Sequence, residues 1–361
     1  MNTIIEMFNK SNDIIKKLPD ELSKMLYEIR IKNALYHDYD ALCDDILNLD
    51  VEWHISELDE MFRKHDRVDD IVIFGAGING RHTAALIKKS KYKDIPLLFC
   101  DNNKEMWGKT CCGLPIISPN ELYSLHRFGI TIVGSSSNRQ EIYEQLIFEC
   151  GLTGYQRDRI LYPALNVLFG STGWQYFDFF SPRDKEVFVD CGCFNGQTSL
   201  DFINWTKGNF KKIYAFEADP YSINRCKEII KDVNKEKILF VEKAVWHRKE
   251  MLKFDSRYDG GAKINSNGDA LIEADTIDNI LNGERVTFIK MDIEGAENNA
   301  LLGAKNTILK WKPRMAISVY HKPIDILEIP TTILKMDSNY NFALRQYQSN
   351  TSETILYAWQ D

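Results

Sequence analysis

The sequence predicts an α/β protein with two Rossmann-like domains. Apolar runs of strand length alternate with helix-like segments from about residue 70 onward, which is typical of parallel sheets with helical crossovers. Twice a glycine-rich loop follows a strand and an acidic residue ends the next strand, at Asp101 and at Glu217. With 361 residues, the chain is long enough for two hydrophobic cores.

Residues 1–65 are predicted to form a helical N-terminal segment. Apolar residues such as Ile14, Leu18, Leu22 and Met25 recur there at intervals of three or four. This amphipathic segment could pack on the first Rossmann-like unit or make a contact in a homo-oligomer. Membrane-surface binding is less favoured, because its lysines are balanced by acidic residues.

The first α/β unit is assigned to residues 66–165. A strand is predicted at Ile71–Phe74, followed by a glycine loop and a helix over Arg81–Lys89. A second strand over Pro96–Cys100 leads to Asp101. The later elements are a strand at 114–117, a helix at 119–125, a strand at 130–134, a helix at 139–150 and a strand at 160–163.

The loop of the first unit is typical of a phosphate site. No acid precedes its glycines Gly75, Gly77 and Gly80, and the cation Arg81 follows them. Backbone N–H groups at a helix N-terminus attract anions. Asp101 stands 21 residues after Gly80, where it would meet ribose hydroxyls. We therefore expect a nucleotide such as NAD or a nucleotide-sugar, although glycines that serve only tight packing are the open alternative.

Residues 166–185 are expected to connect the two units. Gly170, Gly173 and Pro182 interrupt the periodicity, and six aromatic residues lie between 169 and 180. These aromatic residues could pack at an interface or form a lid over the second site.

The second unit, residues 186–361, has a different loop. Asp190 stands before the first glycine, Gly192, and Glu217 stands 21 residues after the last one, Gly196. A carboxylate at this place would repel a diphosphate but would suit the ammonium group of S-adenosylmethionine (SAM). This unit therefore predicts a site for an amino-acid nucleoside.

The order of elements in the second unit also favours SAM. Sequential strand–helix–strand units closed by an antiparallel C-terminal hairpin describe a SAM-dependent methyltransferase better than a dehydrogenase. The predicted elements are strands at 187–190, 212–216, 238–242, 286–291 and 315–319, helices at 198–204, 221–231 and 297–310 and after Pro323, a hairpin or mobile insertion at 252–274, and a C-terminal strand pair at 340–346 and 353–359.

Candidate catalytic residues follow two later strands of this unit. Asp292 and Glu294 come after one strand, and His321 comes after the next. His321 is the best candidate for a general base, because the ordinary pKa of histidine lies near neutrality. Asp292 and Glu294 could orient the substrate, bind the cofactor or help hold a divalent cation, so metal use stays open. Glu297 is expected to cap the following helix.

Composition excludes several classes of function. The net charge is −7 without a basic run, which argues against nucleic acid as the partner. The eight cysteines have no zinc-site spacing, and a nucleophilic role for Cys191 or Cys193 is disfavoured, since no histidine is near in sequence. No apolar stretch is long enough for a membrane span and the N-terminus lacks a signal-peptide pattern, so we expect a cytoplasmic protein.

Several ordered motifs between residues 185 and 359 resemble the FkbM family of SAM-dependent methyltransferases. They are Val-Phe-Val-Asp190-Cys-Gly192-Cys-Phe-Asn195-Gly196-Gln-Thr198-Ser, Phe216-Glu217-Ala-Asp-Pro220, Asp275-Thr-Ile-Asp278, Phe288-Ile-Lys-Met-Asp292-Ile-Glu294-Gly-Ala-Glu297 and Ile317-Ser-Val-Tyr-His321-Lys-Pro323. The resemblance implies a class I SAM methyltransferase fold and O-methylation of a sugar or natural-product hydroxyl.

The same resemblance implies roles for individual residues. Asp292, Glu294 and His321 would face the acceptor. The residues expected to bind the cofactor are Asp190, Gly192, Asn195, Gly196, Thr198 and Glu217. We expect an O-methyltransferase acting on a hydroxyl of a glycan or nucleotide-linked sugar. An NAD-dependent oxidoreductase using the first loop is the alternative, although its Tyr-x-x-x-Lys signature is missing, and a non-catalytic nucleotide-binding protein is a third.

Overall fold

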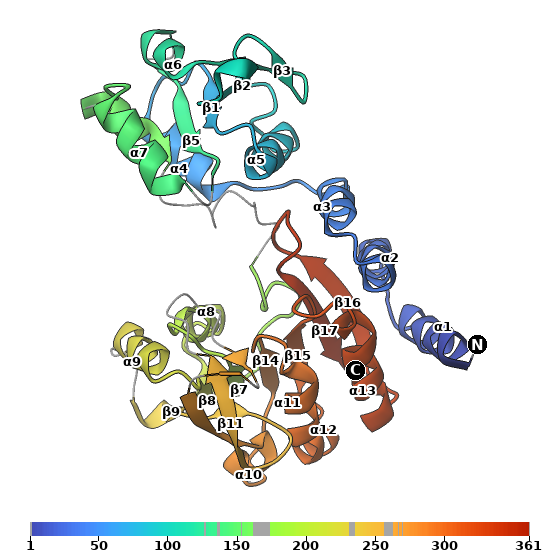
Figure 1. The fold of residues 1–361 in the computed structure, drawn as a ribbon. Helices are drawn as coiled ribbons and strands as arrows, with labels where there is room; N and C mark the ends of the chain where they lie inside the picture. The colour runs from blue at the N-terminus through green and yellow to red at the C-terminus, as the bar shows by residue number, and fades with distance from the viewer. Residues whose placement is uncertain are drawn as a thin grey trace. The chain divides into compact units, whose positions relative to one another are not determined.

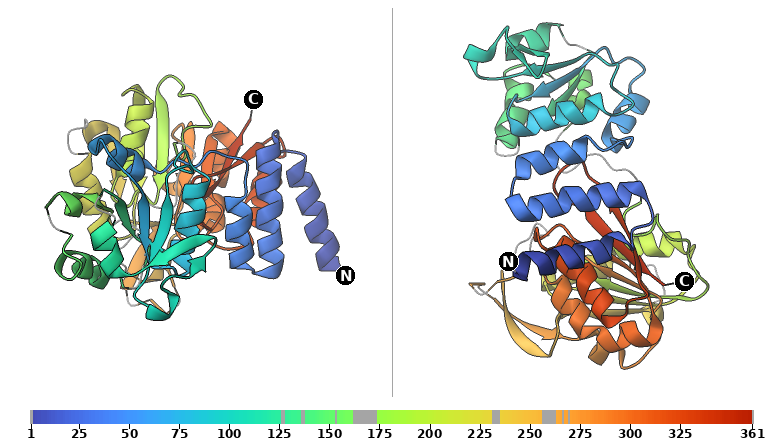
Figure 2. Two further views of the ribbon diagram at one scale, coloured as in Figure 1. Left: turned by 90° about the horizontal axis from the view of Figure 1, so that it is seen from above. Right: turned by 90° about the vertical axis from the view of Figure 1, so that its right-hand side faces the viewer.

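The computed structural model describes residues 2–125, 128–135, 138–152, 154–161, 174–230, 235–255, 263–265, 267–268 and 270–360 (Figures 1 and 2). The chain forms two compact units. One consists of Met1–Leu42, Gly173–Tyr347 and Thr351–Asp361, and the other of Cys43–Thr172 and Gln348–Asn350. Each unit has its own sheet and core. No helix among the described residues is long and apolar enough to cross a bilayer.

The C-terminal unit is built on a seven-stranded sheet with the order β16-β17-β15-β14-β7-β8-β9. Only β17 is antiparallel, and it pairs with both β15 and β16. This topology confirms the predicted class I methyltransferase fold with its C-terminal hairpin. The strands are β7 (Glu186–Cys191), β8 (Phe210–Phe216), β9 (Ile238–Val241), β14 (Phe288–Met291), β15 (Arg314–Ser318), β16 (Asn341–Gln346) and β17 (Thr354–Trp359).

The helices of this unit form two groups (Figure 1). Because crossovers between parallel strands are right-handed, the helices that follow β7 and β8 cover one face of the sheet and those that follow β14 and β15 cover the other. The segment predicted as one helix over 297–310 is two helices that meet at Ala304. The helices are α8 (Gln197–Trp205), α9 (Pro220–Ile229), η3 (Lys235–Lys237), α10 (Ile277–Leu281), α11 (Glu297–Gly303), α12 (Lys305–Trp311) and α13 (Asp325–Met336).

A small second sheet stands where a hairpin or mobile insertion was predicted. Its strand order is β10-β13-β11-β12, and β11 pairs antiparallel with both β12 and β13. The hairpin alternative is therefore confirmed for the described residues, whereas 256–262 lie outside them. The strands are β10 (Ala244–Val245), β11 (Glu250–Asp255), β12 (Lys263–Ile264) and β13 (Ala270–Asp275).

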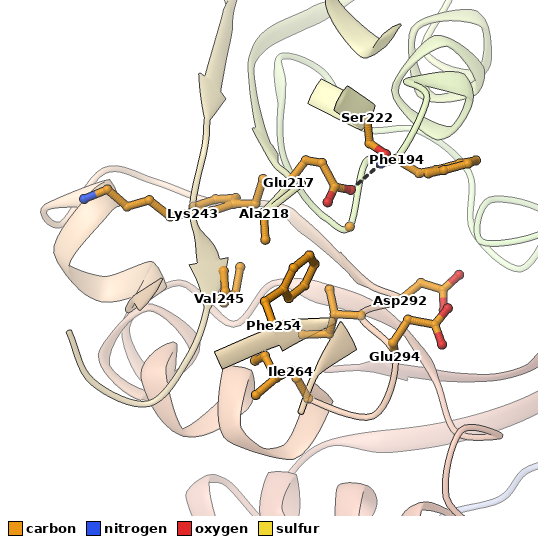
Figure 3. Close-up of a pocket in the computed structure, with 15 residues that line it drawn as sticks. Phe194, Glu217, Ala218, Ser222, Lys243, Val245, Phe254, Ile264, Asp292 and Glu294 are labelled. Atoms are coloured by element: carbon orange, nitrogen blue, oxygen red, sulfur yellow. Dashed lines mark hydrogen bonds between the residues drawn. The ribbon is translucent and has the colours of Figure 1, made fainter. Parts of the chain in front are cut away.

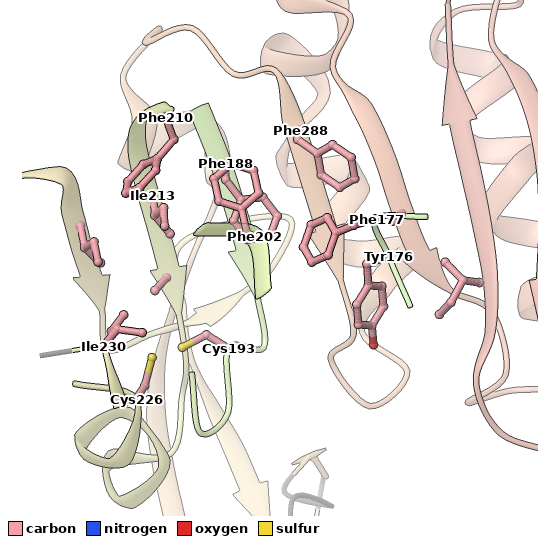
Figure 4. Close-up of a cluster of buried hydrophobic side chains, with 14 of the residues drawn as sticks. Tyr176, Phe177, Phe188, Cys193, Phe202, Phe210, Ile213, Cys226, Ile230 and Phe288 are labelled. Atoms are coloured by element: carbon pink, nitrogen blue, oxygen red, sulfur yellow. The ribbon is translucent and has the colours of Figure 1, made fainter. Parts of the chain in front are cut away.

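An aromatic core fills one side of the large sheet (Figure 4). The rings of Phe188 and Phe202 stack with centroids 4.3 Å apart. Phe177 belongs to the predicted connector. The centroid of its ring lies 5.7 Å from that of Phe288 and 5.3 Å from that of Trp205. Tyr176, Phe177, Phe179 and Phe180 of the connector therefore pack in or against this core, as the packing alternative predicts, whereas Trp174 is exposed. Residues 166–173 of the connector lie outside the described residues.

The first two helices, α1 (Asn2–Ile15) and α2 (Glu21–Tyr36), pack on the C-terminal unit. The α2 residue Ser23 accepts a hydrogen bond from the Leu344 N–H at 2.9 Å, and Lys17 O accepts one from Phe342 N–H at 3.0 Å. The expectation that the helical segment packs on the first Rossmann-like unit is wrong for these helices. The reason is that β16 is an edge strand, and α2 meets its free backbone groups.

The N-terminal unit has a six-stranded sheet with the order β3-β4-β2-β1-β5-β6, parallel except for β3. This open α/β sheet is the Rossmann-like arrangement that the sequence predicts. The helices are α3 (Tyr39–Leu47), which spans the division at Leu42, α4 (Ser56–Lys64), α5 (Ile78–Lys88), η1 (Lys104–Met106), α6 (Pro119–Leu125), α7 (Arg139–Phe148) and η2 (Gly154–Arg159). The strands are β1 (Ile71–Phe74), β2 (Leu97–Cys100), β3 (Thr110–Cys111), β4 (Leu114–Ile117), β5 (Ile130–Val133) and β6 (Ile160–Leu161).

Candidate active site

The loop after β7 requires its glycines. Gly192 has φ +79°, and a Cβ atom there would lie 2.0 Å from the carbonyl oxygen of Asp292. Gly196 has φ +87°, and a Cβ atom there would lie within 3.1 Å of Cys226 backbone atoms. Any side chain would therefore push the loop away from β14 and α9.

Glu217 holds this loop from the end of β8. Its carboxylate accepts hydrogen bonds from the N–H groups of Phe194, at 2.9 Å, and Asp219, at 3.0 Å (Figure 3). Burial raises the pKa of Glu217, and these backbone N–H groups oppose the rise. The spacing that predicted a ribose-binding acid thus places Glu217 beside the loop, as expected for such a site.

A cavity of about 170 Å³ lies over the carboxyl ends of the strands (Figure 3). Gly192 and Glu217 line it, as do Asp292 and Glu294, whose carboxylates lie together at one end. Phe254, from the insertion sheet, also lines this cavity. The cavity therefore connects the expected ribose acid with two of the expected catalytic acids.

Asp190 lies beneath the loop and does not line this cavity. It is fully buried, with Ser199 Oγ donating to it at 2.7 Å and Lys290 Nζ 3.2 Å away. Lys290 also donates to the carbonyl oxygen of Gly192 at 2.7 Å. The expected partner of Asp190 was a ligand ammonium, whereas the structure shows a lysine of its own chain. Asp190 therefore shapes the loop through Lys290.

The other expected cofactor residues lie around the same loop. Asn195 accepts a hydrogen bond from the Gln197 N–H at 3.0 Å, and Gly196 is the N-cap residue of α8. Thr198 lines a second cavity, of about 360 Å³. Asp292 lines both cavities, and the second is also lined by Trp174, Gln175, Tyr176, Phe177, Gln197, Asp201 and Glu353.

Asp292 is the centre of a polar network. Tyr176 OH donates to it at 2.7 Å and Tyr320 OH at 3.3 Å, and His321 Nε2 lies 3.4 Å from its Oδ1 atom. Burial acts to raise the pKa of Asp292, but the charges of Lys290 and His321 hold it below its usual value. Asp292 is therefore a carboxylate at neutral pH.

His321 is surrounded by carboxylates. Its Nδ1 atom lies 3.0 Å from Glu297, and its Nε2 atom lies 3.4 Å from Asp292 and 3.7 Å from Glu294. Burial lowers the pKa of His321, but these acids, led by Glu297, raise it to about 9. The argument for His321 as the general base assumed an ordinary pKa. In this environment the ring holds its proton at neutral pH and so cannot accept another.

Glu297 binds backbone N–H groups of the loop between β14 and α11. Its Oε1 atom accepts hydrogen bonds from Ile293 N–H at 2.9 Å and Gly295 N–H at 3.4 Å. Glu294, in the same loop, has φ +56°. Glu297 therefore holds the backbone turn that contains Glu294. It does not cap α11, because the N-cap residue is Ala296 and no side chain makes a cap hydrogen bond there.

Sequence reasoning missed Glu353, Tyr176 and Tyr320. Glu353 precedes β17 and accepts hydrogen bonds from Tyr320 OH, at 3.2 Å, and from Gln175. Burial, followed by the charge of Asp292, raises the pKa of Glu353 to about 7. A signal for Glu353 existed, since an antiparallel strand starts at the edge where its parallel neighbours end. Tyr176 belongs to the aromatic connector that could have covered this site, but no pattern in the sequence distinguished it from the other aromatic residues there.

The two loop cysteines have structural surroundings. Cys191 and Cys193 are buried. Burial raises the pKa of Cys191, and a hydrogen bond with Cys226 together with burial raises that of Cys193. Neither thiol is a ready nucleophile, as expected.

The N-terminal unit has a cavity of about 500 Å³ at its own glycine loop. Gly75, Gly77 and Asp101 line it, and Asp101 accepts a hydrogen bond from Ala76 N–H at 2.8 Å. Gly80 does not line the cavity but packs against the backbone of Gly75, where a Cβ atom would lie 1.8 Å from the carbonyl oxygen of Gly75. Arg81 is exposed and does not line the cavity. The expected loop and acid therefore meet, but without the expected cation.

Each of the two units contains a segment that matches the model of a known protein family. Residues 190–346 match the model described as the Methyltransferase FkbM domain. The C-terminal unit contains an FkbM methyltransferase domain. The match includes Gly192, Glu217, Asp292 and His321, so the candidate site lies inside the FkbM domain, and the chain is a SAM-dependent methyltransferase. Residues 68–161 match the family described as C2185-like, N-terminal.

Solved structures similar to this chain include several methyltransferases. Methyltransferase FkbM from Methylobacillus flagellatus is 22% identical, with 91% of this chain and 99% of that chain covered and a TM-score of 0.48. An rRNA methylase from Streptococcus thermophilus is 16% identical, with coverages of 50% and 89% and a TM-score of 0.34. Aeropyrum pernix fibrillarin, with bound SAM, is 12% identical, with coverages of 50% and 68% and a TM-score of 0.33. No curated protein matches this sequence.

Proposed function

We propose that the FkbM domain transfers the methyl group of SAM to a hydroxyl group of a sugar. The single observation that carries this proposal is that Asp292 lines both cavities of the domain. A methyl donor and its acceptor must meet at one point, and the ionised carboxylate of Asp292 stands where the two cavities come together.

The first cavity suits the adenosine of SAM, and the second, of about 360 Å³, is proposed to take both its methionine and the acceptor. The adenosine would lie in the cavity of about 170 Å³, with its ribose hydroxyls donating to Glu217. The methionine would extend past Gly192 toward the cavity that Thr198 lines. Because Asp190 faces Lys290, the carboxylates near the ammonium would be Asp201 and Asp292. The sulfonium would then lie beside Asp292.

The groups around the acceptor position suit a sugar. Asp292, Glu353 and Gln175 offer hydrogen-bonding groups to hydroxyls, and Trp174, which is 54% exposed, offers an apolar ring face. No lysine or arginine is among the described residues that line the cavity of about 360 Å³. These groups support a neutral, hydroxyl-rich acceptor over a phosphorylated one.

The reaction would be an in-line displacement. The acceptor oxygen attacks the methyl carbon, the carbon–sulfur bond breaks, and S-adenosylhomocysteine leaves with the electron pair. The hydroxyl proton passes to a carboxylate, for which Asp292 and Glu353 are placed at the site. His321, protonated at neutral pH, would help to fix the position of Asp292.

We also propose that the N-terminal unit binds a nucleotide, either NAD or the nucleotide of a nucleotide-linked sugar. The cavity at Gly75 and Gly77 with Asp101 at its side supports this role, since Asp101 can accept hydrogen bonds from ribose hydroxyls. Binding of uridine diphosphate, its sugars and NAD to the purified chain, measured by calorimetry, tests it. Absence of binding to any of them would contradict the proposal.

The experiment for the methyl-transfer proposal is a direct assay. The full chain is incubated with SAM and a panel of free, nucleotide-linked and glycan-linked sugars, and mass spectrometry follows S-adenosylhomocysteine and methylated products. Base treatment distinguishes ether products from esters. Methylation of carboxyl or amino groups alone, with no sugar ether formed, would refute O-methylation of a sugar.

A further inference from the structure

A group of side chains beside the cavity is arranged as cation ligands would be. One nitrogen of His321 and one oxygen from each of Asp292 and Glu297 lie within 4.8 Å of one another. Two oxygens on opposite sides of Mg²⁺ with bonds of about 2.1 Å would stand about 4.2 Å apart, so donor atoms within 4.8 Å of one another need only small shifts to reach one ion. The three donors are therefore close enough to share one ion. They come from the loops after β14 and β15.

Buried polar atoms at this position lack hydrogen bonds. His321 has an 8% exposed side chain, and neither ring nitrogen makes a hydrogen bond of good geometry to a described residue, although carboxylates lie 3.0 to 3.7 Å away. The Oε2 atom of fully buried Glu297 has no such partner either. His321 has Glu297 as its ion-pair partner, whereas buried polar atoms such as Glu297 Oε2 are almost always satisfied, so this oxygen indicates a missing partner.

The charges at the same position also do not balance. Asp292, Glu294 and Glu297 surround one histidine. The nearby Lys290 is paired with Asp190, and Lys322 donates to the carbonyl oxygen of Gly295. Burying carboxylates without compensating charge is costly, and a dication would offset it.

We propose that Asp292, Glu297 and His321 bind a divalent cation, which displaces a proton from the His321 ring when it binds, with Glu294 beside them. Two carboxylates and one neutral imidazole suit Mn²⁺, whereas Mg²⁺ would bind chiefly through the carboxylates. If the proposed function is correct, a hydroxyl oxygen of the acceptor would complete the coordination at the acidic end of the cavity. A cation lowers the pKa of an oxygen that it binds, so it would help the hydroxyl lose its proton.

The test measures cation binding alone, on the full chain without SAM or acceptor. Electron paramagnetic resonance follows the loss of free Mn²⁺ during titration, and Mg²⁺ serves as the competitor. We expect one Mn²⁺ per chain. His321→Gln and Asp292→Asn should weaken binding at least ~10-fold. Glu328→Gln, at an exposed position on α13, is the matched control and should bind like wild type.

The outcomes separate the two proposals. Equal Mn²⁺ binding by wild type, His321→Gln and Asp292→Asn, or none by wild type, would overturn the cation site. Circular dichroism shows whether each variant is folded, and Glu294→Gln provides a further variant on a less buried side chain. SAM binding, measured separately by calorimetry, decides the proposed function whether or not Mn²⁺ binds.

Discussion

At the scale of single residues, the ion pair between Asp190 and Lys290 changes the role expected for the acid before the second glycine loop. The acid before the glycines suggested a direct contact with the cofactor. The structure shows a buried ion pair that positions the loop through the carbonyl oxygen of Gly192. Any effect of Asp190 on SAM binding would therefore be indirect, and it should accompany a loss of stability.

The first prediction concerns this pair. Asp190→Asn should destabilise the protein by about 3–5 kcal/mol, because it leaves the buried ammonium of Lys290 without its counter-charge. Denaturant unfolding measures the change. The double variant Asp190→Asn with Lys290→Met should recover part of the loss, since both charges are removed. If Asp190→Asn keeps wild-type stability but loses SAM binding, Asp190 contacts the cofactor directly.

Glu217 should instead affect binding more than folding. Glu217→Gln keeps the size of the side chain but weakens acceptance of hydrogen bonds from the ribose hydroxyls. We expect SAM affinity to fall about 10- to 100-fold, or ~1.4 to 2.7 kcal/mol. Calorimetry measures the affinity, and Glu284→Gln, an exposed acid of the same unit paired with Lys212, is the control. Unchanged affinity would contradict the ribose assignment.

The raised pKa of Glu353 predicts a pH dependence of stability. A carboxyl whose folded pKa is about 7, above its ordinary 4.5, favours folding while it is protonated and loses that contribution as pH rises through 7. Wild-type stability should therefore fall by on the order of 1–3 kcal/mol relative to Glu353→Gln between about pH 4.5 and pH 8. Denaturant unfolding at several pH values gives both curves. Parallel curves would show that Glu353 is not perturbed.

At the scale of elements, the edge formed by β14, β15 and β17 builds the site. Asp292 and His321 follow the carboxyl ends of the parallel strands β14 and β15. Glu353 lies at the same edge because it precedes β17, which runs antiparallel to them. The loops after these strands then fix the positions of the site residues. Glu294 lies in a turn with positive φ, and the backbone of Gly192 lies close to that of Asp292. The element order could be predicted, because each strand has its own apolar run.

A glycine substitution tests how the loop and β14 meet. Gly192→Ala places a Cβ atom 2.0 Å from Asp292 O, so it should reduce both stability and SAM affinity. Gly208→Ala is the control, since it has a similar φ of +76° but nothing within 4 Å. It should cost only the ~1–2 kcal/mol of left-handed backbone strain. Unfolding and calorimetry measure both variants, and equal effects would show that strain alone matters at Gly192.

At the scale of the whole molecule, the chain contains two units, each with its own core. Calorimetric unfolding should therefore show two transitions. SAM at 100 times its Kd should stabilise the transition of the FkbM domain by about 2.7 kcal/mol and leave the other unchanged. Nucleotides that bind the N-terminal unit should do the reverse. One transition that SAM shifts as a whole would show that the units unfold together.

Local sequence determined much of this protein. Apolar runs defined strands such as β1 and β4, glycine spacing located both loops, and strand ends located Asp292, Glu294 and His321. Tertiary structure alone decided the rest. It brought together Lys290 and Asp190, Tyr176 and Asp292, and α2 and β16. Partners that lie so far apart in the sequence meet only when the chain folds. It also decided the charge of His321, since a pKa depends on burial and on neighbouring carboxylates that the residue's own sequence position does not reveal.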